Sequence, residues 1–319
     1  MPRHHTVEVN GIRLHVAEEG EGPLVLLLHG FPEFWYSWRH QLTALARAGY
    51  RAVAPDQRGY GSSDCPDSQD AYSILHLTGD VIGLINALGE DQAYVVGHDW
   101  GALVAWSTAT LRPDVVRGVA GLSVLPPHGR GPVPPLQQMH QRFDGRFYWN
   151  YFEQPGIAEA EFGKDLDRTF RRMLYGASGD RPLSGPPGPP LVPEGKGFLD
   201  LAADPERLPS WLTEEDIAAY VTAFGQSGFT GPLNWYRNLD RNWELTSAWD
   251  GARIEVPALF VVGDRDRAFP GHDNIVSALA PVAPHHHDPV VVAGAGHWVQ
   301  QERPTEVSSA LLSFLASLT

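Results

Sequence analysis

Residues 93–102, AYVVGHDWGA, join a segment of strand character to one of helix character through a single tight turn. The first four residues form a short apolar run that is typical of a strand buried on both faces. The residues that follow, ALVAWSTATL, have the composition of a helix. Asp99 lies at the junction, between Gly97 and Gly101, which allow the helix to pass close to the strand. In a parallel α/β sheet such a residue projects beyond the carboxyl end of its strand, where ligands bind.

The rest of the chain repeats this strand-then-helix pattern. Further apolar runs bounded by turn residues predict strands at 24–28 (LVLLL), 52–55 (AVAP), 118–124 (GVAGLSV), 258–263 (ALFVVG) and 289–294 (PVVVAG). Two helical stripes lie between or after them, one formed by Leu77, Val81, Leu84, Ile85 and Leu88 and the other by Leu311, Phe314, Leu315 and Leu318. Strands that alternate with helices predict an α/β fold, with a mostly parallel central sheet and helices on both of its faces.

The alternation stops near Pro126-Pro127 and resumes near Ile254. We therefore expect residues 1–126 and 254–319 to form the α/β core, and residues 127–253 to form a helical insertion. The insertion is rich in aromatic residues and poor in β-branched runs. It contains PLSGPPGPPLVPEGKG at 182–197, whose prolines exclude a helix or a central strand and predict a mobile loop.

Asp99 has the chemistry of a nucleophile at this turn. A carboxyl group with an ordinary pKa of about 3.9 is already an anion at neutral pH, and the N-terminus of the following helix favours the charged form. Such a carboxylate can displace a leaving group from a strained or activated carbon. The product would be an ester on Asp99, which must then be hydrolysed.

Hydrolysis of an ester requires a base, a group that orients the base, and donors for the oxyanion. His297 follows the last predicted strand and is the candidate base, while Asp266 follows the preceding strand and is the candidate orienting acid. Asp264 is the competing acid, but it directly follows Gly263 and is well placed to serve the turn itself. The backbone N–H groups of Phe31 and Trp100 are the expected oxyanion donors.

These motifs resemble those of a known family. HGFPE at 29–33, GHDWG at 97–101, GDRD at 263–266 and GHW at 296–298 are similar to the motifs of α/β-hydrolase-fold epoxide hydrolases, above all the hydrolase domain of the soluble forms. The order of nucleophile, acid and histidine is that of α/β-hydrolases. The resemblance runs from about residue 6 to the C-terminus, and it includes FYWNYFEQPGIAEAE at 147–161 and YVTAFGQSGFTGPLNWYRN at 220–238, which resemble that family's cap.

The resemblance implies two cap tyrosines that bind the epoxide oxygen and assist its departure. By motif position these are Tyr148 and Tyr220, and Tyr151 is the rival to Tyr148, one helical turn further on. Tyr220 shares an apolar stripe with Ile217, Val221 and Phe224, on a helix that Thr213 could cap. We expect the substrate pocket to be lined by His29, Pro32, Trp100 and Trp298. We expect His98 to pack under the turn, pointing away from Asp99.

The composition of the chain limits the binding partners and the cellular compartment that we expect for this protein. The formal net charge of −14 over 319 residues disfavours nucleic acid and anionic membranes as partners. A strongly anionic substrate is also disfavoured, unless a local basic pocket overrules the average. Cys65 is the only cysteine, and the first residues have no apolar run behind their Arg, so a cytoplasmic protein is expected. The Ala-, Gly-, Pro- and Arg-rich composition would suit a bacterial genome of high GC content.

No cofactor or metal is expected. His285, His286 and His287 resemble a metal-binding tract, but consecutive side chains cannot all face one ion, so we interpret them as a solvated loop. The predicted partners are a small epoxide and water, in a monomer or homodimer. The predicted function is conversion of an epoxide to a vicinal diol through an ester on Asp99, hydrolysed by water that His297 activates. The alternatives are a haloalkane or haloacetate dehalogenase of the same fold and a non-catalytic, ligand-binding member.

Overall fold

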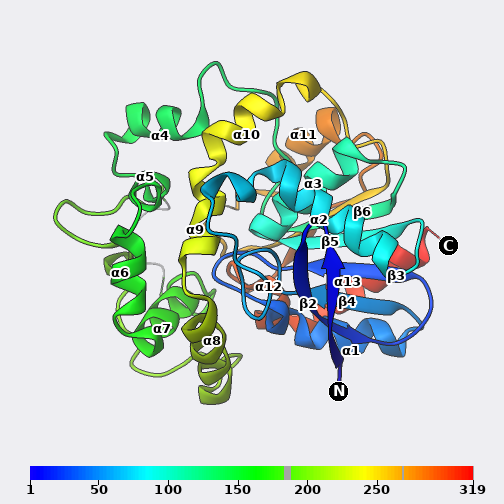
Figure 1. Ribbon diagram of the computed structural model, residues 1–319, viewed down its shortest axis with the longest axis horizontal. Coiled ribbons are helices and arrows are strands. Elements are labelled where there is room, and N and C mark those ends of the chain that lie inside the picture. Colours follow the sequence, from blue (N-terminus) through cyan, green and yellow to red (C-terminus); the bar gives the residue numbers. More distant parts are fainter. Residues whose placement is uncertain (183–187, 268, 319) are drawn as a thin grey trace.

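The computed structural model describes residues 1–182, 188–267 and 269–318, and over these residues it contains one eight-stranded sheet (Figure 1). The strands are β1 (Arg3–Val9), β2 (Ile12–Glu19), β3 (Leu24–Leu28), β4 (Arg51–Pro55), β5 (Ala93–His98), β6 (Val116–Leu122), β7 (Ala258–Gly263) and β8 (Val290–Val292). Their order across the sheet is β1-β2-β4-β3-β5-β6-β7-β8. The pairs from β4 to β8 are parallel, whereas β1 with β2 and β2 with β4 are antiparallel. The prediction of a mostly parallel sheet is confirmed.

The hairpin of β1 and β2 is absent from the predicted strands. Its two-residue turn consists of Asn10 and Gly11, whose φ angles are 47° and 78°. Positive φ at both positions defines the type of turn that matches the twist of two antiparallel strands, and Asn-Gly is its strongest sequence signal. The signal was therefore present in the sequence, although the flanking residues are too polar to form an apolar run.

Helices cover both faces of the sheet. The core helices are α1 (Arg39–Arg47), α2 (Ile74–Ala87), α3 (Trp100–Leu111), α11 (His272–Val282), α12 (Val299–Glu302) and α13 (Pro304–Ala316). Side chains of β3 alternate between two hydrophobic clusters, with Leu26 and Leu28 in one and Val25 and Leu27 in the other. The first cluster includes residues of α2, α3 and α11, and the second includes residues of α1, α12 and α13. This alternation places β3 and β5 in the middle of the core.

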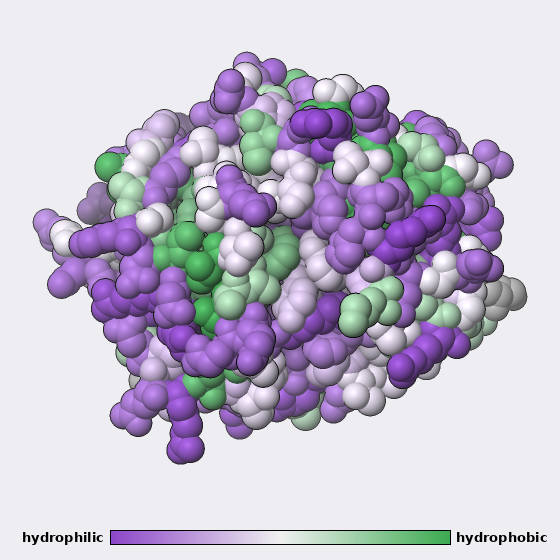
Figure 2. Space-filling view, turned by 60° about the horizontal axis from the view of Figure 1, so that its bottom comes forward, coloured by the Kyte–Doolittle hydropathy of each residue, from purple (hydrophilic) through white to green (hydrophobic). Residues whose placement is uncertain are grey.

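The insertion lies between β6 and β7 and is helical. Its helices are α4 (Pro135–Phe143), α5 (Tyr148–Glu153), α6 (Ile157–Gly163), α7 (Leu166–Gly176), α8 (Glu214–Ser227), α9 (Thr230–Arg237) and α10 (Leu239–Leu245). In Figure 1, α4 to α8 lie to the left of the sheet, and α9 and α10 lie between them and the core. These α-helices fall within residues 127–253, the range predicted for the insertion. On the face shown in Figure 2, hydrophobic side chains form one group left of centre and another at the upper right, and hydrophilic side chains surround both.

Polar contacts fasten the insertion to the core at separate points. The Tyr36 hydroxyl donates to Asp216 at 2.9 Å, and Arg39 forms an ion pair with the same carboxylate at 3.0 Å. The Trp235 indole N–H donates to the carbonyl of Arg58 at 3.1 Å. The first hydrophobic cluster also continues from the sheet into the insertion, so the two parts share one core.

The proline-rich segment 182–197 is described only in part, because residues 183–187 lie outside the described ranges. Residues 188–197 contain no helix or strand, in keeping with the predicted loop, and backbone hydrogen bonds attach part of this loop to the chain before α5. The N–H of Val192 donates to the carbonyl of Arg146 at 2.8 Å, and the N–H of Tyr148 donates to the carbonyl of Pro190 at 3.2 Å. The segment therefore pairs with the chain that enters α5 and helps to position the start of that helix.

The histidine tract lies in a loop, as predicted, with His285 exposed and with His286 and His287 half-buried. The N–H of His287 donates to the carbonyl of Ala258 at 2.8 Å, next to β7. The His287 ring packs edge-on against Phe314, with the ring centroids 5.0 Å apart.

Among the described residues, no helix combines the length and the apolar character that crossing a bilayer requires.

Candidate active site

The turn between β5 and α3 holds Asp99 in a strained backbone conformation. Its φ and ψ angles are 53° and −120°, which a residue other than glycine rarely adopts. The flanking glycines make the close approach possible. A Cβ at Gly97 would lie 2.0 Å from the carbonyl oxygen of Gly101, and a Cβ at Gly101 would lie 2.1 Å from that of Leu28. The strand, the turn and the helix can therefore pack in this way only with glycine at both positions.

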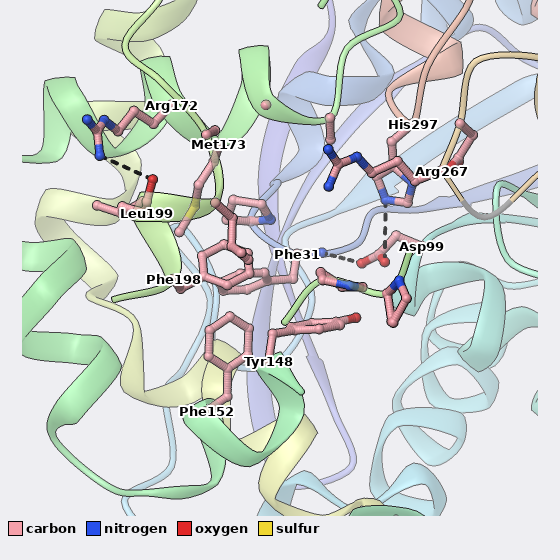
Figure 3. Close-up of a pocket in the computed structure, with 18 of the residues that line it drawn as sticks. Phe31, Asp99, Tyr148, Phe152, Arg172, Met173, Phe198, Leu199, Arg267 and His297 are labelled. Atoms are coloured by element: carbon pink, nitrogen blue, oxygen red, sulfur yellow. Dashed lines mark hydrogen bonds and ion pairs between the residues drawn. The ribbon is translucent and has the colours of Figure 1, made fainter. Parts of the chain in front are cut away.

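The two oxygens of the Asp99 carboxylate face different partners. The backbone N–H of Phe31 donates to Oδ1 at 2.7 Å, and Nε2 of His297 lies 3.6 Å from Oδ2 (Figure 3). Burial alone would raise the pKa of Asp99, but His297, His98 and the Phe31 N–H lower it below its usual value. Asp99 is consequently an anion at neutral pH, with one oxygen held by a backbone donor and the other facing the imidazole.

His297 is oriented by the acid that the sequence favoured. Its Nδ1 lies 3.0 Å from Oδ2 of Asp266. Asp264, the competing acid, instead accepts the N–H of Gly294 at 2.7 Å, in the loop that follows β8. Burial disfavours the charged imidazole, but Asp266 and then Asp99 raise the pKa of His297 well above its usual value. The structure therefore brings Asp99, His297 and Asp266 together, with one ring nitrogen of His297 towards each carboxylate.

A cavity of about 500 Å³ opens in front of Asp99 and His297. Its walls come from both the core and the insertion and are mostly apolar; they include Phe31, Pro32, Phe147, Tyr148, Phe152, Met173, Pro190, Phe198, Leu199, Tyr236 and Trp298. Two of these residues are tyrosines, Tyr148 on α5 and Tyr236 on α9. Burial, and then nearby charge that includes that of Asp99, raises the pKa of Tyr148 and the pKa of Tyr236. Both phenols therefore remain protonated and can donate to an oxygen in the cavity.

Comparisons with known proteins agree with this architecture. A family model described as the alpha/beta hydrolase fold matches residues 23–173. The chain is 47% identical to epoxide hydrolase A of Mycobacterium tuberculosis, over 99% of this chain and 98% of that protein. It is 44% identical to epoxide hydrolase 3 of Siraitia grosvenorii, over 98% of each. The chain belongs to the α/β-hydrolase-fold epoxide hydrolases.

Solved structures of epoxide hydrolases superpose on nearly the whole chain. One from an endophytic Streptomyces matches with a TM-score of 0.93 and 44% identity, covering 99% of this chain and 96% of that one. One from Vigna radiata matches with a TM-score of 0.92 and 42% identity, covering 99% and 98%. The α/β-hydrolase fold and the epoxide hydrolase family, both expected from the motifs, are thus confirmed.

Tyr220 does not take the place expected for the second tyrosine of an epoxide hydrolase. Its side chain is fully buried and is not among the residues that line the cavity. Its ring packs against Phe34 and Phe170, and its hydroxyl accepts from the Gln301 amide at 3.0 Å. Thr213 does cap this helix, accepting the N–H of Asp216 at 3.1 Å. The apolar stripe that contains Tyr220 turns the phenol into the core, so the prediction that it reaches the substrate is wrong.

Tyr236 is the residue that sequence reasoning missed. It lies near the end of the same quoted motif, in NWYRN at 234–238. The sequence offered one signal for it, because the motif contains a second tyrosine near its end in addition to Tyr220 at its start. Tyr151 is correctly set aside as the rival to Tyr148, because its hydroxyl donates to Glu161 at 2.9 Å and it does not line the cavity.

The predicted pocket residues divide into two groups. Pro32 and Trp298 line the cavity, whereas His29 and Trp100 do not. His29 is fully buried, and its Nε2 accepts the N–H of Gln57 at 3.0 Å. The Trp100 ring packs edge-on against Tyr236, with centroids 5.2 Å apart, so it supports the cavity wall from behind. Trp100 is the first residue of α3, and its N–H as an oxyanion donor stays a prediction.

A buried polar network lies under the site. His98 is fully buried, and its Nδ1 lies 2.7 Å from Oε2 of Glu33, while its Nε2 lies 2.8 Å from the carbonyl of His297. The same Glu33 oxygen accepts the N–H of Gly30 at 3.1 Å, next to Phe31. Although burial opposes its charge, His98 and the Gly30 N–H lower the pKa of Glu33. His98 thus points away from Asp99, as predicted, and joins the loop that contains Phe31 to the loop that contains His297.

Proposed function

We propose that this epoxide hydrolase converts epoxides to vicinal diols through a covalent ester on Asp99. The proposal depends on one observation, which is that the two oxygens of that carboxylate have different partners. Oδ1 accepts the Phe31 N–H at 2.7 Å, and Oδ2 lies 3.6 Å from His297 Nε2, at the edge of a cavity that two phenols also line. One oxygen is therefore available to attack, while the other is held where an oxyanion donor is needed.

In the first step, Oδ2 of Asp99 attacks one carbon of the epoxide ring, and the bond from that carbon to the epoxide oxygen breaks. The departing oxygen takes a proton from Tyr148 or Tyr236. A neutral phenol can supply this proton, which is needed because a bare alkoxide is a poor leaving group. The product is a hydroxyalkyl ester on Asp99.

In the second step, His297 takes a proton from water, and the resulting hydroxide adds to the ester carbonyl carbon. Oδ1 then carries the negative charge, and the Phe31 N–H that already contacts it stabilises that charge, with the Trp100 N–H as the second donor. Collapse of the tetrahedral intermediate breaks the bond between the carbonyl carbon and Oδ2, and the diol oxygen that leaves takes a proton from the imidazolium. Asp99 is left as a carboxylic acid, and its proton returns to the tyrosinate, which restores the resting enzyme.

Formation of the ester also prepares the base. In the free enzyme, Asp266 and Asp99 together raise the pKa of His297. Esterification removes the Asp99 charge, so the pKa of His297 falls at the moment when a neutral imidazole is required. The Asp99 carboxylate therefore acts as the nucleophile, and its esterification lowers the pKa of His297 so that the imidazole can act as the base.

The test is to stop the cycle between its two steps. His297→Gln should form the Asp99 ester but hydrolyse it very slowly, so that an adduct accumulates. Mass spectrometry after treatment with styrene oxide should show the mass of one substrate added, on the peptide that contains Asp99. Asp99→Asn provides the matched control and should show no adduct. Absence of added mass in His297→Gln, in a variant that folds normally, would contradict the covalent mechanism.

Two alternatives are weaker on the same observations. A dehalogenase needs donors for a halide rather than proton donors for an alkoxide, and the two phenols facing the cavity support the epoxide. Diol formation, measured against halide release on matched substrates, separates these reactions. A non-catalytic member would turn over no epoxide, so diol production from any member of an aliphatic and aryl panel excludes it.

We also infer that the insertion serves as the cap of this enzyme, since it supplies Tyr148, Tyr236 and much of the cavity wall. The single cysteine supports a cytoplasmic setting, and composition supports a bacterial source. Size-exclusion chromatography with light scattering would distinguish the expected monomer or homodimer.

A further inference from the structure

Glu302, the last residue of α12, is a buried acid that the proposed reaction does not use. It is 4% exposed. Its Oε2 accepts the N–H of Gly179 at 2.8 Å, the N–H of Gly296 at 3.0 Å and the hydroxyl of Ser178 at 3.2 Å. Its Oε1 accepts the N–H of Trp298 at 3.1 Å. The side chain therefore joins the insertion to residues 296–298, the His297 loop.

The donors around Glu302 are neutral groups. Among the described residues, no basic side chain forms an ion pair with it. Burial raises the pKa of the Glu302 carboxyl, and the N–H groups of Gly296 and Gly179 oppose that rise. Backbone N–H groups can only donate, so the arrangement fits the unprotonated carboxylate. A buried charge without a counter-ion is stable only where hydrogen bonds offset its desolvation, so these donors must stay close to it.

The His297 loop carries the proposed base of ester hydrolysis. The residues before and after His297 both donate their N–H groups to Glu302. The N–H of His297 itself donates to the carbonyl of Ala177, in the insertion, at 2.8 Å. One side chain and one carbonyl thus accept three consecutive N–H groups, and they fix the backbone from which the imidazole projects.

The insertion packs against this loop with its backbone. A Cβ at Gly296 would lie 2.3 Å from the nitrogen of Gly179, and a Cβ at Gly179 would lie 2.6 Å from the nitrogen of Gly296. The Trp298 indole N–H also donates to the carbonyl of Leu174, in α7, at 2.7 Å. The chain that follows α7 therefore lies directly on the His297 loop, and Glu302 bridges the two backbones at that contact.

We propose that Glu302 is a positioning residue for ester hydrolysis, which holds the His297 loop against the insertion so that the imidazole faces the Asp99 ester. This inference rests on the proposed reaction, in which His297 activates water for the second step. A general base must lie within hydrogen-bond reach of that water. A displacement of about 1 Å can lower the rate on the order of 10²-fold. Glu302 acts through the backbone on either side of His297 and takes no part in bond breaking.

The first step should not depend on this contact. Asp99 lies between β5 and α3, and Tyr148 and Tyr236 lie on α5 and α9. None of the four donors to Glu302 comes from these elements. Loss of the Glu302 carboxylate should therefore slow ester hydrolysis much more than ester formation. A general loss of stability would not separate the two rates, because both are measured in the molecules that remain folded.

The experiment measures both steps in Glu302→Gln. This variant keeps the size of the side chain, but its amide nitrogen cannot accept a hydrogen bond, so it loses the charge and at least one contact. Excess enzyme is mixed rapidly with styrene oxide, and mass spectrometry of quenched samples follows the ester over time. Ester hydrolysis should slow roughly 10- to 100-fold while ester formation changes by less than about threefold, so that the ester accumulates.

Glu306→Gln is the charge-matched control. Glu306 is exposed in the first turn of α13, and its replacement should leave both rates unchanged. Ester hydrolysis at the unsubstituted rate in Glu302→Gln, or an equal slowing of both steps, would overturn the positioning role and leave the proposed reaction intact. Absence of any ester in His297→Gln would instead refute the proposed reaction, and this inference with it.

Ser178→Ala tests the contribution of the insertion and replaces Glu302→Gln if that variant does not fold. It removes one donor from the insertion side and leaves Glu302 in place. Ester hydrolysis alone should slow, by roughly twofold to tenfold. In the double variant the two effects should be less than multiplicative, because both changes act on one contact. An unchanged rate in Ser178→Ala, or fully independent effects, would overturn the link between the insertion and the base.

Discussion

Individual side chains at this site are distinguished by what surrounds them rather than by their type. Tyr148, Tyr220 and Tyr236 are all tyrosines of the insertion, but only Tyr148 and Tyr236 line the cavity. Asp264 and Asp266 are separated by one residue, yet one accepts a turn N–H and the other faces His297. These contrasts supply matched controls for the roles proposed here.

The two cavity tyrosines should each contribute to ring opening. Tyr148→Phe and Tyr236→Phe should each slow ester formation by roughly 10- to 100-fold, because one phenol remains to protonate the leaving oxygen, and the double variant should be slower still. Tyr220→Phe should leave the rate within about twofold. Single-turnover kinetics with excess enzyme measures this step directly. A large loss in Tyr220→Phe, with none in Tyr236→Phe, would contradict the assignment.

The pH dependence of ester hydrolysis should report the Asp266 contact. Hydrolysis requires neutral His297, so its rate should rise with pH through the pKa of His297 in the ester and then level off. Because Asp266 raises the pKa of His297, Asp266→Asn should move this rise to lower pH. The plateau should fall by on the order of 10²–10⁴, since an amide stabilises an imidazolium poorly. Asp264→Asn should keep the original profile, and a shift of the same size there would argue against Asp266 as the orienting acid.

Around Asp99, the elements of the core pack with their backbones close together. β5, the Asp99 turn and α3 pack so closely that Gly97 and Gly101 have no room for a side chain. The carbonyls of Leu28 and His29, which lie at the start of the loop that contains Phe31, lie against Gly101. The loop that donates to Asp99 and the helix that follows Asp99 are thereby positioned by the same contact.

Replacement of Gly101 should show the cost of that contact. In Gly101→Ala, the added methyl would lie 2.1 Å from the Leu28 carbonyl oxygen, so the backbone must shift. We expect a loss of about 3 kcal/mol or more in the free energy of unfolding, with a large loss of activity. Gly163→Ala is the control, since nothing lies within 4 Å of a Cβ there, and it should be neutral or stabilising by up to about 1 kcal/mol. Urea unfolding measures both, and equal effects in the two variants would refute the argument.

Across the whole molecule, the core and the insertion share one hydrophobic cluster and enclose the cavity between them. Phe31 from the core packs against Phe152 of α5, with ring centroids 5.6 Å apart, and against Tyr236 of α9 at 5.5 Å. The active site is therefore complete only when both parts are folded and docked.

The two parts should accordingly unfold as one cooperative unit. Phe152 is fully buried and also contacts Phe198 and Tyr236, so Phe152→Ala should cost about 3–5 kcal/mol. The loss should appear equally in β5 and in α8 when hydrogen exchange is followed against denaturant. Exchange of α8 in a separate transition at lower denaturant would show instead that the insertion unfolds independently of the core.

Sequence by itself determined the central strands, the alternation with helices, the turn at Asp99 and the acid–histidine pair that serves it. These features depend on local patterns: apolar runs, glycine spacing and the order of residues at strand ends. The N-terminal hairpin was missed, although Asn10-Gly11 is also a local signal, because its strands are half polar. Family resemblance located the tyrosine motifs, but it did not decide which tyrosine of the second motif faces the substrate.

Only the tertiary structure decided which side chains converge on the cavity. Tyr220 points into the core, Tyr236 replaces it, and His29 and Trp100 lie behind the wall rather than in it. Arg181 and Arg267, more than eighty residues apart in the chain, border the same space. The direction of a helix face and the meeting of distant loops are set by how whole elements pack, and no pattern within a single segment encodes that packing.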